Sequence, residues 1–348
     1  MDSGRDSQTL YILLSSYNGA KYIAEQIGSI RAQTLTDWLL IVRDDGSSDA
    51  TVSIVEAFSG MDARIGLLRD ERGNLGPVAS FGALLDHASE RGAAYVALAD
   101  QDDVWRTDKL RRQMELLQAH EAAAGPGHPT LVHSDLAVVG DDLQPIHPSY
   151  LRRQGLEHLG VDPLRRLLAQ NFVTGCTTMF NRALLRAAIP MPRIVMHDWW
   201  LAQCAAALGT LLFVEEPTVL YRQHGSNVLG SRGTMQMHLD TFLRPLTTWA
   251  REGRNLAATS EQACTLAMRL ESLSDGMPVD PQTMSLVMKF CQALRGGRSP
   301  LARLLEVRRL GVHPRARTFP VHFYLRVLCG VPAGSGWSRQ VWRPGQGT

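Results

Sequence analysis

Short apolar runs and amphipathic stretches alternate along the first part of the chain. Four runs have the length of β-strands and are almost continuously apolar, and they lie within residues 9–18, 37–49, 64–70 and 93–100. Each is followed by apolar residues at helical spacing, within residues 19–33, 50–58, 76–92 and 108–123. Apolar strands that alternate with helices are typical of a parallel sheet covered on both faces. The pattern therefore predicts an α/β fold.

The alternation weakens after a stretch rich in Gly and Pro at residues 122–129. Strands are expected at residues 130–140 and 171–180, a helix at 198–209 and a pair of strands at 211–225. From about Thr234 onward the chain has one helical pattern after another, at residues 235–246, 258–273, 281–294 and 300–310. This change predicts a helical region at the C-terminal end.

Polar turns end each of the first four strands. Their sequences are SSYN, RDDGSSD, RDERGNLG and ADQDD, in chain order. In parallel sheets, ligands bind beyond the carboxyl ends of the strands. We therefore expect these four loops to line one site.

The sequence ALADQDDVW places the carboxylates of Asp100, Asp102 and Asp103 close together. Such neighbours repel one another unless a positive group lies among them. A hard divalent cation, Mg²⁺ or Mn²⁺, prefers oxygen ligands and commonly links carboxylates to phosphates. The alternative is that two of the three cap the helix expected to begin near Thr107.

Composition narrows the class of protein. The net charge of +2 is too small to indicate a nucleic-acid-binding protein. The five cysteines form no close pair, and we expect buried thiols in a reducing compartment. The N-terminal residues lack a secretion-signal pattern, and no apolar stretch reaches the ~20 residues that span a bilayer. We therefore expect a cytoplasmic protein.

Four segments in order along the chain resemble the family 2 glycosyltransferases with the GT-A fold, in particular bacterial rhamnosyltransferase-like members. They are LLSSYNGAKYIAEQIGSIRAQT, LLIVRDDGSSDAT, NLGPVASFGALL and ALADQDDVW. The resemblance implies a mixed sheet flanked by helices over residues 8–230, with a donor half at about 8–125 and an acceptor half at 126–230. We expect the helical region to occupy residues 231–330 and a flexible tail to follow at 331–348.

The resemblance also implies an activity. In this family a sugar is transferred from a nucleotide-diphospho-sugar, whose diphosphate binds a divalent metal, Mg²⁺ or Mn²⁺, on the Asp-x-Asp motif. dTDP-rhamnose is the first donor that it suggests, and the acceptor would be a saccharide or a lipid-linked saccharide in cell-surface polysaccharide synthesis.

Several residues of the first half would then hold the donor. Ser15 and Tyr17 would lie beside the nucleotide, and Asp45 would hydrogen-bond its base. Asp100 would face the ribose or the sugar, and Asp102 would bind the metal directly.

Each of these assignments has a structural alternative. Tyr17 is equally explained by core packing, and either Asp44 or Asp45 by helix capping. Asp103 leaves open which pair of carboxylates binds the metal. A structural role is expected for Asn74 in its Gly-rich turn.

The second half would supply the base that removes the proton from the acceptor hydroxyl. In the family this is the Asp of an acidic-Asp pair, usually Glu-Asp, and the match here is Asp198, with His197 in place of Glu. The dipole of the expected helix favours an ionised carboxylate at its start, and Trp199 and Trp200 offer an apolar wall for a sugar. The alternative for Asp198 is a plain helix cap.

Two further segments complete the expected site. His224 would be an additional metal ligand, and Arg222 would neutralise the departing diphosphate. A satisfied structural histidine is the alternative for His224. Gly175 and Thr177 would border the transferred sugar.

The C-terminal region is locally basic. Eight arginines lie between Arg295 and Arg326, opposed only by Glu306. Basic helices with intermittent apolar residues can dock on an anionic membrane, which suits a lipid-linked acceptor. A solvated face packed on the catalytic domain explains them equally.

Other classes of protein fit less well. A Rossmann oxidoreductase needs Gly-x-Gly-x-x-Gly after the first strand, which SSYNGAKY lacks. A Mg²⁺-dependent phosphohydrolase usually has a nucleophilic Asp there, where this chain has Ser15 and Ser16. A non-catalytic nucleotide-sugar-binding subunit would have no need of Asp198 as a base. The resemblance to the family 2 glycosyltransferases therefore remains the basis for expecting an inverting, metal-dependent glycosyltransferase.

Overall fold

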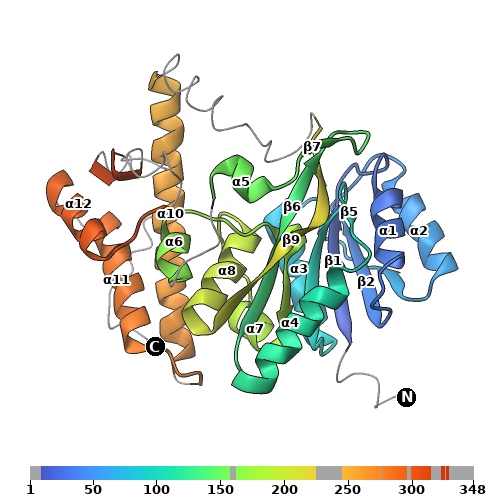
Figure 1. Ribbon diagram of the computed structural model, residues 1–348, viewed down its shortest axis with the longest axis horizontal. Coiled ribbons are helices and arrows are strands. Elements are labelled where there is room, and N and C mark those ends of the chain that lie inside the picture. The colour runs from blue at the N-terminus through green and yellow to red at the C-terminus, as the bar shows by residue number, and fades with distance from the viewer. Residues whose placement is uncertain are drawn as a thin grey trace.

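A mixed β-sheet forms the centre of the computed structural model (Figure 1). The structure describes residues 9–156, 162–224, 245–274, 276–295, 299–314, 323–325 and 327–328. The strands are β1 (Leu10–Ser16), β2 (Trp38–Asp44), β3 (Ile65–Leu67), β4 (Tyr95–Asp100), β5 (Val104–Trp105), β6 (Thr130–Val139), β7 (Pro145–His147), β8 (Met179–Asn181) and β9 (Thr210–Arg222). Their order is β3-β2-β1-β4-β8-β6-β9-β5, and β7 pairs with β6.

Helices cover both faces of this sheet. Those between the strands are α1 (Ile23–Arg31), α2 (Thr51–Met61), α3 (Pro77–Glu90), α4 (Lys109–Ala124), α5 (Tyr150–Gln154), α6 (Pro163–Ala169), the 3₁₀ turn η1 (Gly175–Thr177), α7 (Arg182–Ala188) and α8 (His197–Leu208). The C-terminal helices are α10 (Pro245–Leu273), α11 (Pro281–Arg295) and α12 (Pro300–Arg309). The predicted fold class is confirmed.

The central strand β1 is apolar from Leu10 to Leu14, because both of its faces are covered. It pairs in parallel with both β2 and β4. Leu10, Ile12 and Leu14 pack in the core beneath α1 and α4, whereas Tyr11 and Leu13 pack on the other side with α3 and α8. Because successive side chains of a strand point to opposite faces, a strand covered on both sides needs apolar residues at every position.

The second half of the sheet differs from the expectation in two places. The expected strand at residues 171–180 is mostly irregular, and only its end forms β8, which is antiparallel to β4 and β6. The expected strand pair at residues 211–225 is the single strand β9, parallel to β6 with a register shift between Ser134 and Leu136. Pairing along β6 thus keeps the segment extended where the sequence pattern had indicated a turn.

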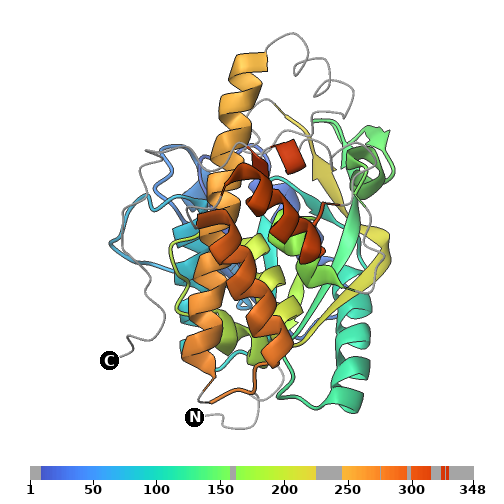
Figure 2. The same cartoon turned by 90° about the vertical axis from the view of Figure 1, so that its left-hand side faces the viewer.

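The C-terminal helices pack on the sheet domain (Figures 1 and 2). Leu266 of α10, Phe290 of α11 and Val307 of α12 belong to the same hydrophobic core as Trp200 of α8. The helix expected at residues 258–273 is the last part of the longer α10. Most of the helix expected at 235–246, and the tail at 331–348, lie outside the described residues.

One expectation about the cysteines is wrong. Cys264 of α10 and Cys291 of α11 form a disulfide, because the two helices bring residues 27 positions apart together with Cα atoms at 5.1 Å. Cys176 and Cys204 are buried free thiols, as expected. Among the residues that the structure describes, no helix is both long and apolar enough to cross a membrane.

Candidate active site

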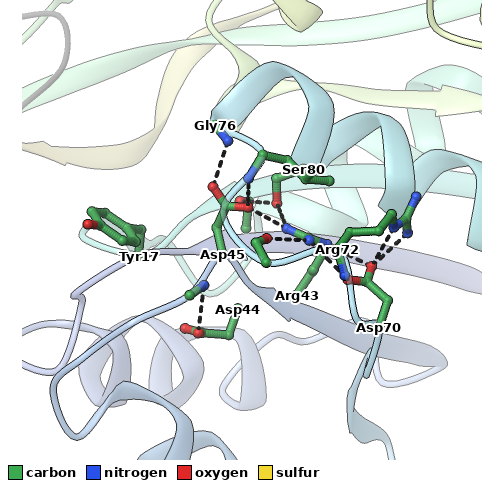
Figure 3. A network of polar contacts seen from close by, with 12 residues as sticks. Tyr17, Arg43, Asp44, Asp45, Asp70, Arg72, Gly76 and Ser80 are labelled. Atoms are coloured by element: carbon green, nitrogen blue, oxygen red, sulfur yellow. Dashed lines mark hydrogen bonds and ion pairs between the residues drawn. The ribbon is translucent and has the colours of Figure 1, made fainter.

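Asp45 joins the end of β2 to the loop that precedes α3 (Figure 3). One carboxylate oxygen, Oδ1, accepts hydrogen bonds from the backbone N–H of Leu75 at 2.8 Å and from Arg43 at 2.5 Å. The other, Oδ2, accepts from the N–H of Gly76 at 2.8 Å. Asp45 is buried, so these contacts fix the loop above the strand ends.

Arg43 is the fully buried centre of this network. Besides Asp45, it donates to both carboxylate oxygens of Asp70, at 2.9 and 3.0 Å, and to the carbonyl oxygen of Gly73. The Arg43 guanidinium holds the pKa of Asp70 well below its usual range. Asp70 therefore stays ionised, and the network shapes the rim on which the nucleotide was predicted to bind.

Neither aspartate at the end of β2 caps α2, which removes that alternative. The N-cap residue of α2 is Ala50, without a side-chain cap. Asp44 instead accepts from the N–H of Gly46 and of Ser47, at 3.1 and 2.7 Å. Gly46 has a positive φ of 88°, which favours glycine in this turn.

Ser15 and Tyr17 lie at the carboxyl end of β1. Ser15 Oγ is 2.7 Å from Ser80 Oγ, which places it against α3. The Tyr17 backbone pairs with the Gln101 side chain in both directions, at 2.8 and 3.0 Å. Tyr17 itself is 51% exposed, so the core-packing alternative does not apply.

The three clustered carboxylates occupy different environments at the end of β4. Asp103 is fully buried, whereas the side chain of Asp102 keeps 16% of its surface exposed. His224 Nε2 lies 2.8 Å from Asp102 Oδ2. Asp100 pairs in register with Ser15, so it stands at the same sheet edge as the donor loops.

These carboxylates do not cap α4, contrary to the alternative, because the N-cap residue of that helix is Asp108. Burial, then Asp102 and Asp198, raise the pKa of Asp100 to about 7. Burial lowers the pKa of the nearby Lys109 to about 7, and its Nζ lies 4.0 Å from the centre of the Trp105 ring. Full ionisation of the cluster therefore calls for a further positive charge.

The donor atoms at this edge fit a hard divalent cation. Oxygen and imidazole ligands are available from Asp100, Asp102 and His224, a set that suits Mn²⁺ and, for its oxygens, Mg²⁺. Ligand atoms of Asp100, Asp103 and Cys176 lie within 4.8 Å of one another. Asp103 Oδ2 is buried without a hydrogen-bond partner among the described residues. Its burial nevertheless favours Asp100 and Asp102 over Asp103 as ligands.

Asp198 lies in the first turn of α8, and its charge contributes to the raised pKa of Asp100 in the acidic cluster. Oδ2 accepts from the N–H of Gly175 at 3.1 Å, and Oδ1 accepts from the side chain of Asn171 at 3.1 Å and the N–H of Trp199 at 2.6 Å. Burial raises the pKa of Asp198 to about 6 despite these donors. The helix begins after Met196, so Asp198 is not its N-cap residue.

His197 is a buried, neutral neighbour of this carboxylate. Burial lowers its pKa to about 3, and its ring stacks on Phe81 at 4.1 Å. Neither ring nitrogen has a hydrogen-bond partner within the described part of the chain. A Cβ atom at Gly175 would lie 3.0 Å from His197 Nε2, so glycine is needed for this close approach.

Two other expectations for this half do not match the structure. Trp199 and Trp200 are buried, and their indole N–H groups donate to the carbonyls of Leu167 and Ala188, at 2.6 and 3.0 Å. They serve the core and cannot form a wall for a sugar. Thr177 is also fully buried, and its hydroxyl donates to the Thr174 carbonyl at 2.7 Å.

Arg222 fixes the acidic loop by a hydrogen bond to its backbone. Its guanidinium donates to the backbone carbonyl of Asp102 at 2.9 Å and also contacts Glu25 and the carbonyl of Asp141. The side chain is 3% exposed. These contacts fix the loop that carries Asp102, and a role toward a diphosphate stays a prediction.

The structure adds two tyrosines that sequence reasoning missed. Tyr150 of α5 and Tyr221 of β9 meet edge to face, with ring centres 5.9 Å apart. Both lie within electrostatic range of the cluster around Cys176. The sequence held no signal for them, because they come from elements far apart in the chain.

Comparisons with known proteins show which sequences and folds this chain is similar to. Residues 11–158 match the family model described as Glycosyl transferase family 2. An uncharacterized glycosyltransferase of Nostoc sp. is 27% identical over 62% of this chain and 65% of its own length. A glucosyltransferase of Escherichia coli, named UDP-Glc:alpha-D-GlcNAc-diphosphoundecaprenol beta-1,3-glucosyltransferase WfgD, is 28% identical over 56% of this chain and 69% of its own.

A further relative and a solved structure are also similar to this chain. The dTDP-rhamnosyl transferase RfbG of Shigella flexneri is 25% identical over 63% of this chain and 74% of its own length. The crystal structure of S. aureus TarS 1-349 in complex with UDP-GlcNAc has a TM-score of 0.54 at 15% identity, covering 87% of this chain and 80% of that one. The fold is the GT-A fold, and the sequence matches support a glycosyltransferase of family 2.

Proposed function

We propose that the chain is an inverting, metal-dependent glycosyltransferase that moves a sugar from a nucleotide-diphospho-sugar to a saccharide or lipid-linked saccharide. The observation that carries this proposal is the convergence of two kinds of carboxylate at one sheet edge. Asp102 is paired with His224 and Asp100 lies at the end of β4, whereas Asp198 is held separately by N–H donors and contributes to the raised pKa of Asp100. Two differently tuned carboxylates suit two roles.

Asp102, Asp100 and His224 would hold the divalent cation. When bound, such a cation supplies positive charge to the diphosphate leaving group. Arg222 keeps the Asp102 loop in place through the Asp102 carbonyl. The proposed contact of Arg222 with the diphosphate would add a second positive charge to the same side.

Asp198 would act as the base. Its carboxylate would take the proton of the acceptor hydroxyl while that oxygen attacks the anomeric carbon of the donor sugar. The bond to the diphosphate oxygen breaks in the same displacement, and the electron pair leaves with the nucleoside diphosphate. A single displacement inverts the anomeric centre. A pKa of about 6 leaves the base mostly ionised at neutral pH.

Ser15, Tyr17 and Asp45 would bind the nucleoside. An ionised carboxylate offers about four acceptor sites, and Asp45 uses three of them on the protein. The remaining site can accept an N–H of a base. We propose dTDP-rhamnose as the first donor to test and a UDP-sugar as the second, because similar relatives are named for each.

Two features of the wider chain belong to the same proposal. Residues 8–230 would form the transferase domain, residues 231–330 a helical region packed on it, and residues 331–348 a tail. The C-terminal helices would bring the enzyme to the cytoplasmic membrane surface, where a lipid-linked acceptor lies. Arg308 and Arg309, in the last turn of α12, are exposed on this region.

The experiment that tests the function is calorimetric titration with dTDP, UDP and GDP, with Mn²⁺ or with EDTA. We expect one nucleotide to bind in Mn²⁺ only, and Asp102→Ala to abolish that binding. Asp108→Ala, at the start of α4, is the matched control. Transfer from the corresponding nucleotide sugar then separates an enzyme from a binding subunit. Nucleotide binding without transfer to any saccharide or lipid-linked acceptor would favour the non-catalytic subunit.

A further inference from the structure

A sugar held between Asp102 and Asp198 needs an apolar surface beside it, and the two tryptophans of α8 are not available for this purpose. Aromatic rings with a polar tip suit such a place, because one part is apolar and the other can hydrogen-bond. Tyr150, the first residue of α5, is partly exposed. It comes from a different layer of the fold than Asp198.

A buried carboxylate fixes the position of Tyr150. Asp135 lies in β6 where the register with β9 shifts. Its Oδ1 accepts from the N–H of Leu151 at 3.2 Å, and its Oδ2 accepts from the hydroxyl of Ser149. Ser149 in turn caps α5 by accepting from the N–H of Arg152 at 3.0 Å. The helix is short, but its start is pinned to the sheet on both sides of Tyr150.

Contacts through Tyr221 place the Tyr150 ring near the acidic loop. The two rings meet edge to face, and Arg222, which follows Tyr221, donates to the Asp102 carbonyl at 2.9 Å. Burial, then Asp198 and Cys176, raise the pKa of Tyr150. The neighbouring Tyr221 has its pKa raised by burial and then by Asp103, Cys176 and Asp100. The charges that act on the two rings are therefore those of the acidic cluster and of Asp198.

The Tyr150 hydroxyl has no hydrogen-bond partner among the residues that the structure describes. A partly buried phenol usually finds one. The hydroxyl is not among the buried unpartnered atoms of the described residues, so it is accessible to a ligand, and Asp135 fixes the start of the helix that carries it.

We propose that Tyr150 binds the transferred sugar, with its ring against an apolar face of the sugar and its hydroxyl bonded to a sugar hydroxyl next to Asp198. This inference rests on the proposed function. It assigns to Tyr150 the role that the sequence had suggested for Trp199 and Trp200. Nucleotide recognition, in contrast, would involve Tyr17 and Asp45 and not Tyr150.

The test compares binding of a nucleoside diphosphate with binding of its nucleotide sugar, by calorimetry in Mn²⁺. The protein is the full chain, either unchanged or carrying Tyr150→Ala or Tyr150→Phe. Tyr95→Phe is the matched control, since Tyr95 lies at the other end of β4 with its hydroxyl on Glu121 at 2.8 Å. The quantity of interest is the dissociation constant of the nucleoside diphosphate divided by that of the nucleotide sugar. This ratio isolates the contribution of the sugar to binding.

We expect Tyr150→Ala to reduce this ratio by about fivefold or more, which corresponds to the loss of one aromatic contact. Affinity for the nucleoside diphosphate should stay within about twofold. Tyr150→Phe should give an intermediate loss, and Tyr95→Phe none. If Tyr150→Ala does not fold, as judged by circular dichroism, the Phe variant decides the matter.

Two results would overturn the inference while leaving the proposed function intact. One is an unchanged ratio in Tyr150→Ala or, if that variant does not fold, in Tyr150→Phe. The other is an equal loss of affinity for the nucleotide and the nucleotide sugar, which would place Tyr150 at the nucleotide. If the unchanged protein binds no nucleotide at all, the proposed function fails, and the inference about Tyr150 fails with it.

Discussion

His224 Nε2 lies 2.8 Å from Asp102 Oδ2, although the two residues are 122 positions apart. The contact joins the end of β9 to the loop after β4, on the edge where the donor loops meet. The His224 ring also stacks on Tyr22, with centres 4.8 Å apart. The imidazole is therefore held in place beside the partly exposed carboxylate of Asp102.

This contact predicts a loss of metal affinity in His224→Ala. Ligands and the groups that orient them typically contribute 10–100-fold to metal affinity, so Mn²⁺-dependent nucleotide binding should weaken by about tenfold or more. Calorimetry with a Mn²⁺ series measures it. His87→Ala, on α3, is the control. An unchanged Mn²⁺ dependence in His224→Ala would leave His224 with a structural role only.

The proposed base predicts a specific defect in Asp198→Asn. The variant keeps the shape of the side chain but cannot take a proton, so turnover should fall by about 10²–10⁴. Nucleotide affinity should stay the same, because Asp198 contacts the acceptor side. Steady-state transfer and calorimetry on the same preparation check both statements. Near-normal transfer by Asp198→Asn would remove Asp198 from this role.

The raised pKa of Asp198 predicts the pH dependence of the reaction. A base works only when deprotonated, so activity should rise as pH increases through about 6 and level off above it. His197→Glu would add a like charge beside Asp198 and move this limb to higher pH. His197→Gln is the neutral control. A pH–rate profile from pH 5 to 8 measures the shift, and the same midpoint in both variants would contradict the prediction.

The buried Arg43 predicts a large effect on stability. Arg43→Met would leave the buried Asp45 without its cation and Asp70 with only the more exposed Arg72, and breaking a buried ion pair typically costs about 3–5 kcal/mol. Urea denaturation measures the free energy of unfolding. Arg64→Met removes a more exposed pair with Asp62 and should cost about 1 kcal/mol or less. Equal losses in the two variants would contradict this account of Arg43.

The disulfide between α10 and α11 makes a prediction about the C-terminal helices. Closing a loop of this size stabilises a protein by about 3 kcal/mol in the chain-entropy model. A variant with serine at positions 264 and 291 should therefore melt at a lower temperature than the oxidised protein. A reducing agent should lower the melting temperature of the unchanged protein but not that of the variant. No effect of reduction on the unchanged protein would show that the bridge does not stabilise it.

Local sequence patterns determined the elements and the edge on which they meet. The alternation of apolar runs with helical spacing is set by the geometry of each strand and helix, so it can be recognised without knowledge of the packing. The same is true of the polar turns, because the ends of parallel strands lie on one edge. Asp100 and Asp102 could therefore be named as candidates from ALADQDDVW, and Asp198 from its likeness to a family pattern.

Only the tertiary structure decided which residues face one another. The contact of His224 with Asp102, the contact of the Tyr150 ring with Tyr221 and the Cys264–Cys291 bridge each join residues from separate elements. Trp199 and Trp200 follow Asp198 directly in the sequence, which suggested that they share its site. Their indoles nevertheless lie in the core, because α8 packs with that face toward the sheet. Burial and long-range contact depend on how elements pack, and the spacing of residues along one element does not contain that information.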